Sequence, residues 1–277
     1  MAQVPTTNPR AYDHYLRGLS FVRKAISRDD WAGNGPQAIA AFERAVAEDP
    51  GFALAWARLS TARSHVYVMG VDGSEANLQA AESAAKRALA LAPQLAEAHM
   101  AMGDVQRFVH HDLAAARDEM VQAVDLRPND PDFLHHLAIT DSVLGNLDAA
   151  IKSWRHAVAL DPQDNLYRSS LGWALTETGD YDAARQAYRR ALVVDPQDLW
   201  ASLALSNLEL LQNGDVDAAT RVLDQMAPGT PVNVAVVTHR IDLLLYQRRF
   251  AEARAMAERY AGAFTTGPAA IDMAFAR

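Results

Sequence analysis

Two pairs of neighbouring histidines are the residues best suited to do chemistry in this sequence. They are His110–His111 and His135–His136, and imidazole is a common metal ligand. Adjacent residues on a helix point about 100° apart, so neither pair can chelate a metal on one helix face. A site would need one histidine from each of two neighbouring segments, and the other interpretation is a polar surface. We expect no bound metal or cofactor.

Carboxylates form no recognisable catalytic pattern either. The segment that contains Asp29–Asp30 and Gly33–Gly35 lacks the alternating oxygen ligands and final glutamate of a calcium loop. Glu43 and Glu119 fall on the outward stripe of amphipathic helices, whereas paired-carboxylate catalysis needs groups that converge in a cleft. No G-x-S-x-G, P-loop or H-E-x-x-H motif occurs. The sequence therefore predicts no catalytic residue and no enzyme activity.

Composition excludes several other classes of function. The chain has 277 residues, a net charge of −8 and no cysteine, which disfavours nucleic-acid binding and rules out disulfides. No run of about 18 apolar residues occurs, so we expect no membrane insertion. The N-terminal segment 1–10 lacks the apolar core of a signal peptide, which favours a cytoplasmic location. Half of the residues are hydrophobic, and the many alanines among them favour packed helices.

An internal repeat organises the whole chain. Prolines follow alanine-rich amphipathic segments at spacings of 43, 35, 34, 34 and 35 residues. One alanine lies twelve residues before each proline, and in most copies a second lies five residues before it, with a usually larger residue between them. The prolines are Pro50, Pro93, Pro128, Pro162, Pro196 and Pro231. The first alanines are Ala38, Ala81, Ala116, Ala150, Ala184, Ala219 and, in a seventh copy, Ala253.

These spacings predict two packed helices in each copy. Alanine lets the second helix approach the first closely, and proline ends it. Gly145, Gly179 and Gly214 fall where a left-handed residue would end the first helix. The packing position of the first helix carries a small residue in successive copies, whereas the seventh copy has Arg240–Ile241 and is expected to be a looser end. The small residues are Ser60, Gly103, Ala138, Gly172 and Ser206.

This pattern resembles the tetratricopeptide repeat, W-x2-L-G-x2-Y…A-x3-F-x2-A…P, over residues 11–263. The resemblance implies an all-α fold, an α-solenoid of about seven helical hairpins stacked into a right-handed superhelix with a concave groove. The extra residues at 27–36 and 69–77 are expected to be surface loops, and segments 1–10 and 264–277 an N-terminal extension and a short helical tail. The expected repeats are 11–50, 51–93, 94–128, 129–162, 163–196, 197–231 and 232–265.

The resemblance also assigns residues to the groove, through the second, fifth, ninth, twelfth and thirteenth positions of each repeat. A protein or peptide is the expected partner, with apolar side chains toward repeats five to seven. The principal groove residues are Met100, Asp104, Arg107, Phe108, His135, Ile139, Trp173, Trp200, Leu203, Asn207 and Tyr246. Further groove positions are Asp132, Val143, Leu166, Ser169, Glu177, Leu210, Leu211, Thr238, Asp242 and Leu245.

Two points about this groove bear on its partner. Trp173 and Trp200 have a second interpretation, as core residues between repeats. Tetratricopeptide arrays that bind the C-terminal tails of chaperones carry Lys and Asn at the fifth and ninth positions. Here Ala57 and Thr61, like the corresponding pairs of later repeats, differ from that clamp, so a chaperone tail is not the expected partner.

Three functions are compatible with this architecture. The first is a non-catalytic scaffold that binds a protein or peptide in the groove. The second is a sensory or regulatory segment of a larger protein, because residues 11–18, AYDHYLRG, resemble repeat segments that follow cyclase, kinase or winged-helix domains in bacterial signalling proteins. The third, an enzyme or metal protein with groups from several repeats, lacks any supporting motif. We expect the scaffold.

Overall fold

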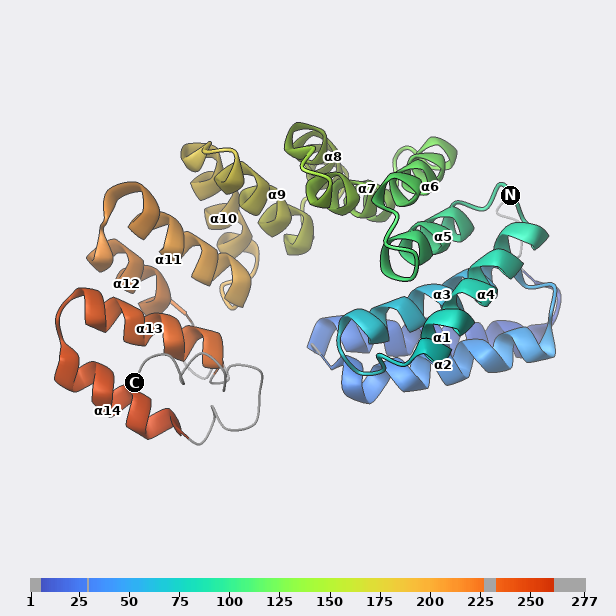
Figure 1. The fold of residues 1–277 in the computed structure, drawn as a ribbon, viewed down its shortest axis with the longest axis horizontal. Coiled ribbons are helices and arrows are strands. Elements are labelled where there is room, and N and C mark those ends of the chain that lie inside the picture. The colour runs from blue at the N-terminus through green and yellow to red at the C-terminus, as the bar shows by residue number, and fades with distance from the viewer. Residues whose placement is uncertain (1–5, 29, 227–232, 262–277) are drawn as a thin grey trace. The chain divides into compact units, whose positions relative to one another are not determined.

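The computed structural model describes residues 6–28, 30–226 and 233–261, which form helices α1 to α14 and no strand. Consecutive helices pair as antiparallel hairpins (Figure 1), which is the expected α-solenoid of about seven hairpins. The helices are α1 Pro9–Arg28, α2 Trp31–Glu48, α3 Ala53–Val68, α4 Glu75–Leu91, α5 Ala96–Phe108, α6 Leu113–Leu126, α7 Pro131–Val143, α8 Leu147–Leu160, α9 Asn165–Glu177, α10 Tyr181–Val194, α11 Leu199–Asn213, α12 Val216–Asp224, α13 Val234–Tyr246 and α14 Phe250–Tyr260.

The chain divides into two compact units. Unit 1 spans residues 1–160 and contains α1 to α8, and unit 2 spans residues 161–277 and contains α9 to α14. Within each unit the second helix of one hairpin packs on the first helix of the next. The first helices also contact one another, α3 with α5 in unit 1 and α9 with α11 and α11 with α13 in unit 2.

The repeated alanines lie where close packing was predicted. All seven first alanines, from Ala38 to Ala253, are buried, and so is the residue between each pair, from Phe42 to Leu223. Glycine on the first helix permits this approach: a Cβ on Gly172 would lie 2.6 Å from the Tyr188 ring, and a Cβ on Gly103 would lie 2.7 Å from Met120. The small-residue spacing is therefore the physical basis of each hairpin.

The ends of the helices also follow the sequence. Each second helix from α2 to α10 ends two residues before one of the repeated prolines, at Pro50 to Pro196. Gly145, Gly179 and Gly214 have φ of +81°, +79° and +62°, so they are the predicted left-handed residues. Pro231 and the tail 264–277 lie outside the described residues.

The expected loop over residues 27–36 is wrong, because α2 already begins at Trp31. The extra residues lengthen the first hairpin instead, to 20 residues in α1 and 18 in α2. Asp30 caps α2 by accepting a hydrogen bond from Gly33 N at 2.8 Å, and Trp31 is buried against Val66. These contacts outweigh the poor helix propensity of the glycines and of Pro36. The second expected loop is helix-free only over residues 69–74.

Candidate functional site

The predicted groove residues of unit 1 differ in exposure. Asp132 and Val143 on α7 are exposed, and Arg107, Phe108 and Ile139 keep partial exposure, whereas Met100, Asp104 and His135 are buried in the protein. The reason lies in the small residues of α3 and α5, because Ala57 and Ala101 belong to one hydrophobic cluster and bring these two first helices into contact. A ligand would therefore meet Asp132 and Val143 of α7 but not the buried Met100, Asp104 and His135.

Asp104 lies at the centre of a buried polar cluster in unit 1. It is 1% exposed, and its carboxylate Oδ1 is 3.7 Å from Nδ1 of His136 on α7. The ring of His136 also lies 6.5 Å from that of His65 on α3, measured between centroids. Burial alone would raise the pKa of Asp104, but His136 and the charge of Arg107 hold that pKa below its usual value. The cluster joins three consecutive first helices electrostatically.

Two histidines of this region, the half-buried His65 and the buried His135, resist protonation. Burial lowers the pKa of His65 to about 4, and burial together with the charges of His136 and Arg107 lowers the pKa of His135 to about 3. His135 Nδ1 also accepts a hydrogen bond from Trp154 Nε1 at 2.8 Å. A proton on that nitrogen would remove the acceptor, so the neutral imidazole fits the packing of α7 on α8.

Unit 2 presents the same repeat positions at its surface. At the second, ninth and thirteenth positions of α9, α11 and α13, every one of the nine residues is exposed. Trp200 is 73% exposed and Trp173 is 43% exposed, so the core interpretation is wrong for Trp200. We call this set the unit 2 face. Its members are Leu166, Trp173, Glu177, Trp200, Asn207, Leu211, Ala235, Asp242 and Tyr246.

The other predicted groove residues of unit 2 frame this face. Leu203, at a fifth position, is buried in a hydrophobic cluster with Leu223 and Leu243, so it supports the face from below. Leu245, one position before Tyr246, is exposed, as is Thr238. The exposed apolar side chains are unusual for a water-facing helix surface and are typical of an interaction site.

The two arginines on the first helices of unit 2 are held by contacts within the fold. Arg168 is buried and donates from Nη2 to the Pro162 carbonyl oxygen at 2.6 Å, and Arg240 pairs with Asp224 of α12 at 2.6 Å. No other lysine or arginine occurs on α9, α11 or α13. The nine residues of the unit 2 face therefore include no basic side chain, and the exposed Arg248 follows α13 in the turn beyond Tyr246.

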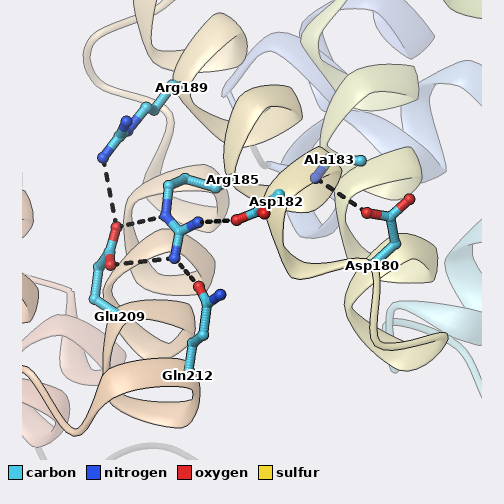
Figure 2. A network of polar contacts seen from close by, with 7 residues as sticks. All are labelled: Asp180, Asp182, Ala183, Arg185, Arg189, Glu209 and Gln212. Atoms are coloured by element: carbon cyan, nitrogen blue, oxygen red, sulfur yellow. Dashed lines mark hydrogen bonds and ion pairs between the residues drawn. The ribbon is translucent and has the colours of Figure 1, made fainter.

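One carboxylate of these helices is also neutralised within the fold. Figure 2 shows Glu209 of α11 turned toward α10, where Arg185 Nε donates to its Oε1 at 3.0 Å. Arg189 lies 3.6 Å from the same oxygen, and Arg185 also binds Asp182 and Gln212. This network fixes the stacking of repeat six on repeat five, and it leaves Glu177 and Asp242 as the carboxylates of the unit 2 face.

Asp242 differs from an ordinary surface carboxylate. Partial burial raises its pKa, and the only group that acts against this within the described residues is His239, one turn before it on α13. Burial lowers the pKa of His239 below its usual value, so that imidazole is uncharged at neutral pH. No charged group among the described residues thus stabilises the negative charge of Asp242 strongly.

Other parts of the described structure are weaker candidates for a functional site. A cavity of about 480 Å³ lies between α12, α13 and α14, but two of its arginines, Arg240 and Arg249, are paired with acidic neighbours. Within the described ranges, no three histidine, aspartate or glutamate side chains lie where they could hold a metal ion. No described helix is long and apolar enough to cross a bilayer.

Comparison with known proteins agrees with this geometry. Two sequence profiles of the tetratricopeptide repeat match the chain, one over residues 137–198 and the other over residues 175–236. The two matches together span residues 137–236. These residues include α9, α11 and the start of α13, which carry most of the unit 2 face. No curated protein matches this chain in sequence.

Solved structures extend the likeness to the fold of most of the chain. The Pseudomonas aeruginosa pilF protein is 16% identical, covers 81% of this chain and 98% of its own, and has a TM-score of 0.61. PilW, described as a type IV pilus biogenesis factor, is 17% identical, covers 84% and 99%, and has a TM-score of 0.63. YrrB, described as having an unusual peptide-binding site, is 20% identical, covers 72% and 97%, and has a TM-score of 0.51.

Proposed function

We propose that the protein is a non-catalytic scaffold that binds a peptide segment of a partner on the unit 2 face. The observation that supports this most strongly is the exposure of Trp200, Leu211 and Tyr246 on neighbouring first helices. Large apolar and aromatic side chains lose favourable burial when they face water, and covering them would recover about 25 cal/mol per Å² of apolar area. Aromatic residues are also the preferred anchors of protein interfaces.

Unit 1 contributes to the fold rather than to this contact. Its ninth positions on α3 and α5, Thr61 and Asp104, are buried, and residues in a packed interior cannot contact a ligand without local opening. On α7 the matching positions Asp132 and Val143 are exposed, but they include no aromatic side chain. The peptide-binding site of YrrB is consistent with peptide binding by a chain of this fold. The regulatory alternative, based on residues 11–18, stays a prediction, and reading the full gene would test it.

Selection of peptides from a random library displayed on phage tests the proposed function. The wild-type protein is expected to enrich peptides rich in apolar residues, and Trp200→Ala and Tyr246→Ala should each weaken a selected peptide about tenfold or more. Phe250→Ala is the matched control, because Phe250 is exposed on α14 and lies off the unit 2 face. Circular dichroism should show unchanged helix content in all three variants.

The proposal fails if no peptide is enriched, or if selected peptides bind the Trp200 and Tyr246 variants as well as they bind the wild type. A loss of affinity equal in the Phe250 variant would also contradict it, because the binding surface would then lie elsewhere.

A further inference from the structure

The charges of the unit 2 face narrow the chemistry of the partner, provided that the proposed function is correct. The face has two carboxylates, Glu177 and Asp242, and none of its nine residues is basic. Arg168 and Arg240 on the same helices are held by other contacts, and the exposed Arg248 lies in the turn after α13. An acidic peptide would meet like charge there, and a neutral one would leave the carboxylates uncompensated. Charge complementarity therefore selects a peptide with a positive charge.

Asp242 is the better placed of the two carboxylates. It lies one turn before Tyr246 on α13, and in the ninth-position row it follows Asn207 of α11. A cation that reaches Asp242 can therefore also contact the Tyr246 ring, and aromatic faces attract cations. Partial burial disfavours the charged form of this carboxylate and raises its pKa. A positive charge on the partner would stabilise the charged form.

We propose that the partner peptide carries a lysine or arginine that pairs with Asp242, flanked by apolar side chains that cover Trp200, Leu211 and Tyr246. The positive charge sets the orientation of the peptide along α13, and the apolar residues supply most of the affinity. The partner is thus a basic, amphipathic segment of a protein rather than an acidic or purely apolar one.

The same phage selection distinguishes this inference from the proposed function. Enriched peptides are expected to contain lysine or arginine next to apolar residues more often than the starting library. One such peptide should bind Asp242→Asn about fivefold more weakly than wild type, which corresponds to a modest charge pair. Asp118→Asn is the control: Asp118 is exposed on α6 of unit 1 and its replacement changes the net charge equally.

A double-mutant cycle then locates the pair. Replacing the basic residue of the peptide by alanine should weaken binding to wild type by a similar factor, and it should add little further loss with Asp242→Asn. Enriched apolar peptides without basic residues would overturn this inference and leave the proposed function intact. The inference would also be overturned if the affinity losses of the two changes were fully additive, or if Asp118→Asn weakened binding as much as Asp242→Asn does. If the selection enriched no peptide at all, the proposed function itself would be overturned.

Discussion

A buried histidine resists protonation because the imidazolium ion loses its hydration in the protein interior. His65 and His135 show this, with pKa values lowered to about 4 and about 3 while the unfolded chain keeps about 6.5. Between these values the unfolded state binds more protons than the folded state. Stability is therefore present above about pH 6.5 and falls as the pH drops toward 4.

This predicts an acid-sensitive unit 1. At pH 5 each of the two histidines should cost about 2 kcal/mol of unfolding free energy relative to pH 7.5. Urea unfolding followed by circular dichroism at the two pH values measures the loss, and His135→Gln, whose amide oxygen can still accept from Trp154, should remove about half of it.

His156→Gln is the control, since His156 is exposed on α8 and should leave the pH dependence unchanged. Equal stability of the wild type at pH 5 and 7.5 would show that neither histidine is held neutral in the fold.

The burial of Asp104 and His135 could not be predicted from their positions in the repeat. Their positions follow from the 34-residue period, but their exposure depends on how closely neighbouring first helices pack. In unit 1 the small residues Ala57 and Ala101 allow α3 and α5 to approach. At the ninth position of unit 2, Trp173 and Asn207 are exposed, whereas Asp104 at the ninth position of α5 is buried, so the same repeat position is part of the interior in one unit and of the surface in the other.

At the scale of helices and turns, the sequence predicted most of the fold because each signal is local. Proline, glycine and alanine act on their own helix or on the next one, so their spacing located the hairpins. The exception was the start of α2, where Trp31 and its packing on Val66 extend a helix through glycines and a proline. Tertiary contacts of that kind have no marker in a single sequence.

The turn inside each hairpin supports a second prediction. Residues 34 or 35 apart take a left-handed conformation in repeats three to seven: His111, Gly145, Gly179, Gly214 and Arg248. His111 and Arg248, with φ of 55° and 58°, are strained there in a way that glycine is not. His111→Gly and Arg248→Gly should each stabilise the protein by about 0.5–1 kcal/mol, seen as a higher urea midpoint.

Gly179→Ala gives the converse. A Cβ at Gly179 meets nothing within 4 Å, so a destabilisation of about 1 kcal/mol would come from the backbone alone. Stabilisation by this change, or destabilisation by the two glycine substitutions, would contradict the assigned turn conformation.

At the scale of the whole molecule, stability should be distributed unevenly between the two units. A repeat array is held together by contacts between neighbouring repeats, so a local change in one unit weakens that unit first. His65 and His135, whose pKa values are lowered most, both lie in unit 1. In unit 2, His239 also has a lowered pKa, but it is less deeply buried.

Hydrogen exchange at pH 7 and pH 5, corrected for the intrinsic rates, tests this distribution. At pH 5 the amides of α3, α5 and α7 are expected to lose protection before those of α9 and α11, because protonation of His65 and His135 disfavours the packing of the first helices in unit 1. The variant with both His65→Gln and His135→Gln should exchange alike at the two pH values. Equal loss across both units would contradict this distribution, because the array would then open as one cooperative body.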